Sequence, residues 1–288
     1  MSGVRVEVMR GGVIESVHDV DVAVVRAGEV VACAGDVDRS AFVRSAVKPF
    51  QALPLVEDGV MERFGLGPEE LALACASHSG EPGHVDVARS TLRKVGVPES
   101  ALACGAHPPF DDDARRRLEA AGEEPGRIHN NCSGKHAGML ALAVAHDWPT
   151  EGYQAEDHPV QARMRAEIER WTAVDRSEIA TGVDGCGVVT FSLPVAGLAR
   201  AFAGLAAAAV AGEPGPAAVV GAMAAHPFLV GGTDRLCTRL MEATDGRVIA
   251  KVGAEGVYGA LTRGGLGIGL KARDGAKRAA EVALLGVL

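Results

Sequence analysis

Ser45 and Lys48 stand three positions apart in the stretch 44–51, at the predicted start of a helix. Residues three apart share one face of a helix, so the hydroxyl and the amine can touch. Serine becomes a useful nucleophile when a base takes its proton. A lysine amine can be that base only if its pKa falls from about 10.4 towards neutrality, through burial or a second nearby cation. Taken alone, the pair also fits a helix-capping serine beside an exposed lysine.

Three further stretches are polar and rich in glycine although their surroundings are apolar, namely 75–81, 129–138 and 181–187. Any one of them could simply cap a helix or form a turn. Four such stretches together, beside Ser-x-x-Lys, favour an active site. A fifth stretch, 251–253, puts a lysine and a glycine at the end of a late strand, which is the position of the Lys-Thr-Gly element in serine β-lactamases and penicillin-binding proteins. In those proteins the order along the chain is Ser-x-x-Lys, then a middle serine, then the late lysine and glycine, and Ser77 would be the middle serine here.

The elements that must position these side chains are strands at both ends of the chain and helices between them. Valine-rich segments predict strands at 4–9, 20–26 and 29–34, and three more strands are expected at 247–252, 256–262 and 266–272. Helices are predicted at 68–75, 84–95, 111–121, 135–146, 159–172, 196–211, 216–225 and 274–285, with a surface loop at 213–216. This order predicts a single α+β domain over residues 1–288. Its antiparallel sheet comes from about 1–40 and 245–288, and a mainly helical region of about 45–245 is inserted.

Composition narrows the class of protein. With 48% hydrophobic residues the chain can bury a large core, and a net charge of -8 argues against nucleic acid as a partner. The first residues contain no apolar core typical of a signal peptide, and the alanine-rich run 199–211 is too short to cross a membrane. We therefore expect a cytoplasmic protein without a membrane partner, whose six widely spaced cysteines are reduced.

The segments RSAVKPFQ, ASHSGE, HNNCSGKHAGM, VDGCG and KVGAEGVYG span nearly the whole chain and resemble the rhizobial-type (class 3, thermolabile) L-asparaginases. The resemblance implies a serine β-lactamase-like fold, a homodimer, and hydrolysis of L-asparagine to L-aspartate and ammonia. It implies that Ser45 is the nucleophile and Lys48 its base. It also implies that Ser77 and Lys251 form a second pair, which relays protons and holds the first pair in order.

The same resemblance implies a zinc ion held by Cys132, Lys135 and Cys186. Cys132 and Lys135 are three apart, which suits two ligands on one helical turn, and Cys186 would join from a glycine-flanked loop. Three protein ligands leave a fourth position open for water. Lysine must lose its proton to coordinate, and the metal can drive that loss. The alternative is two reduced cysteines beside a surface lysine. Because Ser-Lys chemistry needs no Lewis acid, we expect zinc to position the substrate rather than to activate water.

Asparagine offers an α-carboxylate, an α-ammonium and a side-chain amide. Arg44 can hold the carboxylate in bidentate fashion, and Asp184 can pair with the ammonium. Asn131 and His136 are candidates for further hydrogen bonds because they lie close by in sequence. Glu255 follows the late strand and could orient the lysine of that strand.

Other functions remain open at this stage. One is a glutaminase-like or β-lactamase-like serine amidohydrolase that acts on another small amide. A second is a zinc-binding protein without catalysis, and a third is a peptidoglycan binder or peptidase, which would need an export signal. Two Ser-Lys pairs in one chain favour an enzyme over a metal binder.

Overall fold

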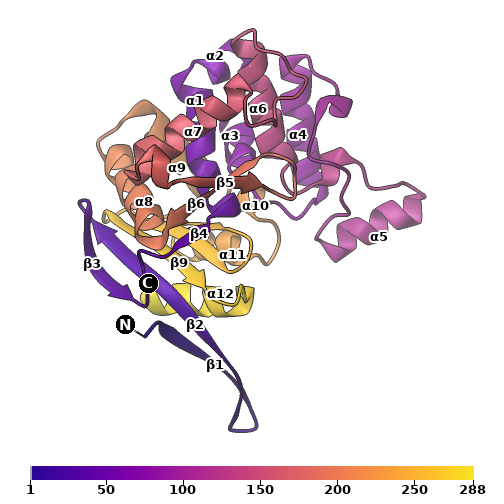
Figure 1. Cartoon of the computed structure of the whole chain (residues 1–288). Coiled ribbons are helices and arrows are strands. Elements are labelled where there is room, and N and C mark those ends of the chain that lie inside the picture. The colour runs from indigo at the N-terminus through magenta and orange to yellow at the C-terminus, as the bar shows by residue number, and fades with distance from the viewer. Residues whose placement is uncertain (1) are drawn as a thin grey trace.

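Strands from the two ends of the chain form one antiparallel sheet in the computed structural model, which describes residues 2–288 (Figure 1). The strand order is β1-β2-β9-β8-β7, and β3 also pairs with β2. Pairing of β2 with β9 runs from Val20 opposite Ala272 to Arg26 opposite Leu266, which joins the first and last parts of the chain. The prediction of a shared sheet is confirmed. Its strands are β1 (Val4–Arg10), β2 (Val13–Arg26), β3 (Glu29–Ala34), β7 (Val248–Val252), β8 (Val257–Thr262) and β9 (Leu266–Ala272).

The long middle of the chain is mainly helical, as predicted. Several helices begin at a proline, where the missing N–H is not needed, and for this reason the loop predicted at 213–216 is instead the first turn of a helix. The final helix begins three residues later than predicted. The helices are α1 (Lys48–Glu57), α2 (Val60–Phe64), α3 (Pro68–Ala74), α4 (Pro82–Val95), α5 (Asp112–Ala121), α6 (Ser133–Ala145), α7 (Pro159–Thr172), α8 (Val195–Val210), α9 (Pro214–Ala225), α10 (Pro227–Val230), α11 (Leu236–Ala243) and α12 (Lys277–Val287).

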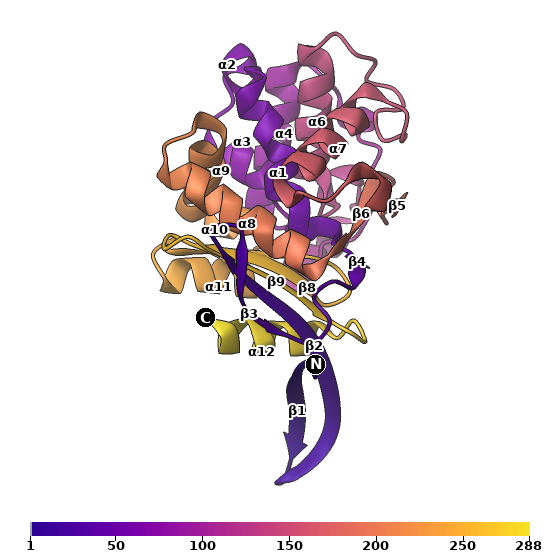
Figure 2. The same ribbon diagram turned by 60° about the vertical axis from the view of Figure 1, so that its left-hand side comes forward.

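Helices cover both faces of the main sheet (Figure 2). α8 crosses one face, and α11 and α12 lie on the other. The close approach of α8 depends on glycine in the strands beneath it. A Cβ on Gly267 of β9 would lie 2.2 Å from Ala199 O, and a Cβ on Gly259 of β8 would lie 2.0 Å from a ring carbon of Phe202. Glycine is therefore required at these positions because a side chain would collide with α8, and the backbone conformation itself does not require glycine.

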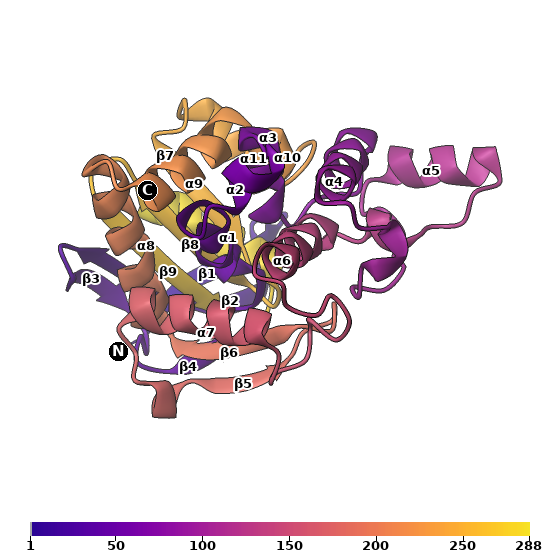
Figure 3. The ribbon, with the colours of Figure 1, turned by 90° about the horizontal axis from the view of Figure 1, so that it is seen from above.

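A second, three-stranded sheet lies within the region that the sequence predicts as helical. It consists of β4 (Ser40–Phe42), β5 (Ala180–Val183) and β6 (Val189–Pro194) in the antiparallel order β4-β6-β5. Seen from above, this sheet runs beneath α7 on one side of the molecule, while α5 projects from the other side (Figure 3). The sequence prediction is wrong to omit these strands. They matter because β4 leads directly into residue 44, and the β5–β6 connection carries residues 184–188.

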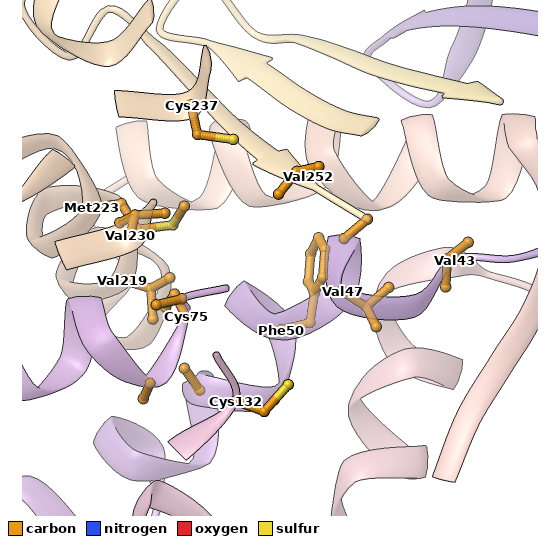
Figure 4. Close-up of a cluster of buried hydrophobic side chains, with 14 of the residues drawn as sticks. Val43, Val47, Phe50, Cys75, Cys132, Val219, Met223, Val230, Cys237 and Val252 are labelled. Atoms are coloured by element: carbon orange, nitrogen blue, oxygen red, sulfur yellow. The ribbon is translucent and has the colours of Figure 1, made fainter. Parts of the chain in front are cut away.

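The apolar core reaches the stretches that the sequence analysis singles out (Figure 4). Val47, Cys75, Cys132 and Val252 are all buried members of one cluster. Val47 and Val252 adjoin Lys48 and Lys251. Cys75 lies two residues before Ser77, and Cys132 is itself a candidate site residue. Lysines anchored in such surroundings lose most of their hydration, which disfavours their charged form.

No single helix within residues 2–288 is long and apolar enough to cross a membrane. α8 and α9 reach that length and hydropathy only as a pair, and they are bent by 100° at the break between them.

Candidate active site

Ser45 lies in a single turn of 3-10 helix, η1 (Arg44–Val47), which continues into α1 at Lys48. Pro49 falls in the first turn of α1, as the sequence predicts, because a missing N–H costs nothing there. Ser45 is half-buried. Arg44, directly before it, has φ +50°, a left-handed conformation that is unfavourable for a residue with a Cβ. Strain of this kind is common beside functional side chains.

The Lys48 side chain is buried, and its amine meets two distant segments. Nζ donates to Ala76 O at 2.6 Å and to Ser77 Oγ at 3.1 Å, and it lies 3.2 Å from Cys132 Sγ. Within residues 2–288, no hydrogen bond joins Lys48 Nζ to Ser45 Oγ. The Lys48 backbone N–H does bond to Ser45 O, so the two residues share a turn while the amine is directed to Ser77.

Ser77 and Lys251, which come from opposite ends of the chain, are in contact. Lys251 Nζ, on β7, donates to Ser77 Oγ at 2.9 Å and to Val252 O at 2.9 Å. The pKa of Lys251 falls to about 7, first because burial disfavours the charged amine and then because the charge of Lys48 lies nearby. Ser77 Oγ therefore links two buried amines, one of which is easily deprotonated.

The turn before α6 is shaped by Asn130, a residue that the sequence analysis passes over in favour of its neighbour. The buried Asn130 side chain accepts a hydrogen bond from Cys132 N at 2.9 Å and donates to Cys104 O at 2.8 Å. A side-chain oxygen that bonds the backbone two residues on forms an Asx turn. The turn fixes the position of Cys132 at the start of the helix.

Cys132, Lys135 and Cys186 meet at the start of α6. Lys135 Nζ lies 3.1 Å from Cys186 Sγ, and the two thiols share a hydrogen bond. That bond, together with the charges of Lys48 and Lys135, holds the pKa of Cys132 well below its usual value and outweighs the opposing effect of burial. The same bond raises the pKa of Cys186. The cluster therefore brings two cysteine sulfurs together with the side chains of Lys48 and Lys135, which favours the thiolate form of Cys132.

Lysine has to be a ligand if this cluster binds a metal. Within residues 2–288, no group of three or more His, Cys, Asp and Glu side chains could hold a metal ion. The donor atoms here are two cysteine sulfurs and one lysine nitrogen, and zinc accepts sulfur and nitrogen ligands once they have lost their protons. The chemistry of the donor set therefore fits zinc.

Arg44 and Asp184, the two proposed partners of the substrate's charges, bind each other. Arg44 Nε donates to Asp184 Oδ1 at 2.8 Å, and the guanidinium Nη2 donates to the same oxygen. Burial would raise the pKa of Asp184, but the hydrogen bond from Arg44 and the charge of Lys135 outweigh it, and the pKa is lowered. The small sheet makes this contact, because β4 precedes Arg44 and Asp184 follows β5.

His136 is fully buried one helical turn below Cys132 and bonds to Tyr153. Tyr153 Oη accepts from Ala103 N at 2.9 Å and lies 2.5 Å from His136 Nδ1. Tyr153 Oη keeps a second lone pair and its own proton, so either the hydroxyl or Nδ1–H can be the donor in the contact with His136. Nε2 is buried and has no hydrogen-bond partner within residues 2–288. Burial, with the charges of Lys135 and Lys48, lowers the pKa of His136 well below its usual value.

The other two proposed substrate contacts lie differently. Asn131 is half-buried, and its carbonyl accepts from His78 N at 3.2 Å, which keeps it beside the loop that carries Ser77. Glu255 is exposed in the turn after β7, and its carboxylate lies so close to Gly275 that a Cβ there would be 2.5 Å from Oε2. The structure therefore does not bring Glu255 to Lys251.

His78 is a polar residue whose role the sequence analysis does not assign. Its ring is fully buried, with Nε2 3.0 Å from Ser133 Oγ and Nδ1 accepting from Gly80 N at 3.1 Å. It stacks on His84, with ring centres 4.9 Å apart. These contacts fasten the loop that carries Ser77 to the first residue of α6. The stretch 75–81 contains the signal, because an imidazole follows its serine directly.

Comparisons with known proteins address the family of the chain. None of the curated proteins compared matches the chain. A solved structure described as "Crystal Structure Analysis of Mglu in its native form" is similar to 92% of this chain, with 15% identity and a TM-score of 0.48, and the chain spans 62% of the length of that structure. The family model for L-asparaginase II matches residues 6–288, so the chain belongs to the L-asparaginase II family.

Proposed function

We propose that the protein hydrolyses L-asparagine to L-aspartate and ammonia, with Ser45 as the nucleophile. Membership in the L-asparaginase II family indicates an amidohydrolase, an L-asparaginase. The observation that carries the proposed mechanism is the contact of Ser77 Oγ with both Lys48 Nζ and Lys251 Nζ, at 3.1 and 2.9 Å. Two ammonium groups this close in a buried site disfavour each other's charge, so one amine is available as a base.

The proton moves along this chain of contacts. At neutral pH part of Lys251, whose pKa is about 7, is an uncharged amine, and in that form it accepts the hydroxyl proton of Ser77 while Ser77 Oγ takes a proton from Lys48. The neutral amine of Lys48 then takes the proton of Ser45 Oγ, which attacks the side-chain amide carbon of asparagine. The carbon–nitrogen bond breaks, and ammonia leaves with the proton that Lys48 holds. A water molecule then hydrolyses the serine ester, with Lys48 again accepting a proton and returning it to Ser45.

Accessibility favours Ser45 over Ser77 as the nucleophile. Ser77 is buried, and its hydroxyl is occupied by two lysines. Ser45 is half-buried, so a small substrate can reach its Oγ. In this assignment Ser77 carries protons and Ser45 forms the covalent bond.

The ion pair of Arg44 and Asp184 supports recognition of a zwitterionic amino acid. A substrate that binds here would give its α-carboxylate to Arg44 and its α-ammonium to Asp184, which replaces one ion pair by two. His136 Nε2 is a buried polar atom without a partner in residues 2–288, and it would bond to a substrate oxygen if it carries the imidazole proton. Asn131 and Glu255 stay as weaker candidates, and only Asn131 lies beside the serine loop.

We propose one zinc ion per chain, held by Cys132, Lys135 and Cys186. Zinc would supply positive charge and two sulfur bonds that fix the connection between β5 and β6, close to Asp184. The neighbouring thiols raise the pKa of Lys135 against the effect of burial, so metal binding must release its proton. Elemental analysis of protein purified without chelator should find the ion, and Cys132→Ser should lose it. Finding no zinc, and no uptake on addition, would contradict this assignment alone.

The serine β-lactamase-like arrangement is also part of the proposal. It is supported by a Ser-x-x-Lys pair at the start of α1 and by Lys251 at the end of a strand in a sheet made by both termini. We propose that residues 1–288 act as one domain. A homodimer and a cytoplasmic location stay predictions from the sequence.

Ammonia release from asparagine and from glutamine tests the proposed function. If Arg44 and Asp184 fix the substrate's length, the extra methylene of glutamine displaces its amide carbon from Ser45, and an error of about 1 Å can cost about a hundredfold. We expect kcat/KM for asparagine to exceed that for glutamine by about this factor.

One variant, tested with two substrates, shows whether Asp184 binds the α-ammonium of asparagine. Asp184→Asn should raise KM for asparagine, but it should leave the slow turnover of asparagine lacking its α-amino group unchanged, since that compound has no ammonium to bind. Comparable kcat/KM values for asparagine and glutamine would favour the alternative, a glutaminase-like or more general serine amidohydrolase.

A further inference from the structure

A cavity of about 540 Å³ lies beside the loop that carries Ser77, and none of the candidate site residues lines it. It forms where this loop meets the start of α5 and the connection from α10 to α11. Its wall includes Ser79, Asp111, Asp234 and Arg235. A space of this size is within the range of small-molecule binding sites.

Hydrogen bonds fix the wall of this cavity. The Glu81 carboxylate accepts from Thr233 N at 2.8 Å and from Thr233 Oγ1 at 2.6 Å. Ser79 Oγ donates to Gly231 O at 3.1 Å, and Ser79 O accepts from Asp111 N at 3.0 Å. The connection to α11 and the start of α5 are therefore held against the serine loop. A ligand would meet a formed site, so ordering of the wall would cost it little affinity.

Arg235 is a cation on this wall without an anionic partner in residues 2–288. The one hydrogen bond that its guanidinium makes there is long, from Nη1 to Ser79 Oγ at 3.5 Å. Arg235 is also the N-cap residue of α11, a helix that has no side-chain cap and no acidic residue in its first turn. The guanidinium and the positive end of the helix dipole both favour a carboxylate at this place.

The carboxylates on the wall favour a ligand that also carries an ammonium group. Asp111 is occupied, because its side chain caps α5, and Asp112 is paired with Arg115. Asp234 is exposed on the cavity wall directly before Arg235, and its carboxylate has no ion pair within residues 2–288. An α-amino acid carries a carboxylate and an ammonium on one carbon, so it complements this adjacent pair of opposite charges.

Lys277, the first residue of α12, adds a second cation to the wall. Its ion pair with Glu281 is 3.4 Å long and exposed on the lysine side, and such pairs contribute little stability. The lysine amine can therefore turn to a ligand. Two cations and one free carboxylate complement the two carboxylates and one ammonium of an acidic amino acid. The proposed reaction releases a compound of this kind, L-aspartate.

The cavity is coupled to the proton relay through Arg235. Burial is the largest cause of the lowered pKa of Lys251, and the charge of Arg235 also lowers it. A carboxylate bound to Arg235 would offset this charge and raise the pKa of Lys251, so less of the uncharged amine would be present at neutral pH. The charged and titratable groups that act on Lys251 from the surrounding elements are Lys48, Cys237, Arg235 and Cys132.

We infer that this cavity is a second binding site, which takes a free acidic amino acid, and that its occupation slows the hydrolysis of asparagine. The α-carboxylate of the ligand binds Arg235, its ammonium binds Asp234, and its second carboxylate binds Lys277. The binding site is independent of the proposed function, whereas the effect on the rate rests on the proposed relay of protons to Lys251.

Calorimetric titration of the full-length protein with L-aspartate tests the binding. Wild type should bind two molecules per chain, one in the cavity and one at Arg44 and Asp184. Asp184→Asn should keep the site in the cavity. Adding Asp234→Asn to that variant should weaken the remaining site about tenfold or more, because a charged pair is lost. Asparagine is tolerated at the φ of +57° found at position 234, and thermal unfolding checks that the fold is kept.

Succinate is the matched probe, because it has two carboxylates and no ammonium. In the Asp184→Asn protein it should bind about tenfold or more weakly than L-aspartate, and Asp234→Asn should abolish this difference. Absence of L-aspartate binding to the Asp184→Asn protein would overturn the inference, and so would equal binding of the two compounds. Loss of one of two sites through Asp234→Asn, with none lost through Asp184→Asn, would support the inference and contradict the proposed substrate contacts.

Steady-state ammonia release tests the effect on the rate. At and below neutral pH, L-aspartate should lower kcat for asparagine in addition to raising KM. The effect on kcat should fade at alkaline pH, where Lys251 is uncharged with or without the ligand. Asp234→Asn should remove the effect on kcat and leave the rate without L-aspartate unchanged. Inhibition that is purely competitive at every pH would overturn the regulatory role. Calorimetry needs no turnover, so it decides the binding site even if asparagine is not the substrate.

Discussion

Tyr153 lies outside every motif of the sequence, and yet its hydroxyl holds the ring of His136. The hydroxyl is bonded to Ala103 N on one side and to His136 Nδ1 on the other. Tyr153→Phe should raise KM for asparagine about tenfold, the effect of roughly 1.4 kcal/mol, because the imidazole then loses the hydrogen bond that orients it. Steady-state ammonia release measures the change, and kcat should fall less than KM rises.

Tyr258→Phe is the matched control for this prediction. Tyr258 is as buried as Tyr153, and its hydroxyl bonds to Glu281 instead of a site residue. This variant should lower the melting temperature without changing KM. An unchanged KM in Tyr153→Phe would show that the imidazole proton does not contact the substrate.

At this scale the sequence predicts residues with distinctive chemistry well and their supporting residues poorly. The motifs identify Lys48, Ser77 and Lys251, which the structure brings together. The sequence does not predict roles for Asn130 and Tyr153, because these roles depend on contacts with backbone groups of distant segments. Nothing in two adjacent asparagines tells which one bonds the turn.

At the scale of elements, the contact between α8 and the main sheet positions Lys251 indirectly, because β7 is fixed by β8 and β9. Gly267→Ala should lower the free energy of unfolding by at least about 2 kcal/mol. The new methyl group would meet backbone atoms of α8 that cannot move aside, and overpacking of this kind is costly. Denaturant unfolding measures the change.

Gly264→Ala provides the comparison, because a Cβ there would meet only Thr262 Oγ1 at 3.6 Å. That variant should have nearly the same free energy of unfolding as the wild type. Equal stability of the two variants would mean that α8 can shift away from β9 at little cost.

The small sheet shows the limit of sequence patterns for short elements. Phe191 and Leu193 of β6 alternate with the less buried Ser192 and Pro194, which is the signal of a half-buried strand. The glycines before them are typical of a loop and conceal that alternation. Strands of three to six residues depend on their partners more than on their own propensity. This sheet is therefore recognised from the structure, where it brings Arg44 and Asp184 into contact.

For the whole molecule, the sequence predicts the main architecture because strands at both ends of a helical chain have few other ways to pair. The projecting hairpin of β1 and β2 is not predicted (Figure 2). Its residues 13–19 mix charged and apolar side chains because most of them face solvent, while Ser16 and His18 contact Arg278 of α12. The meeting of Lys48, Ser77 and Lys251 depends on the complete fold, because these residues lie on α1, on a loop after α3 and on β7.

The most direct test of the account is the rate of ammonia release from asparagine by Ser45→Ala. A covalent nucleophile cannot be replaced by binding alone, so kcat/KM should fall at least about a thousandfold while the melting temperature stays unchanged. Ser90→Ala, a serine on α4 that bonds to Glu70, should keep the wild-type rate. If Ser45→Ala stays within about tenfold of the wild type, Ser45 is not the nucleophile, and the central claim is wrong.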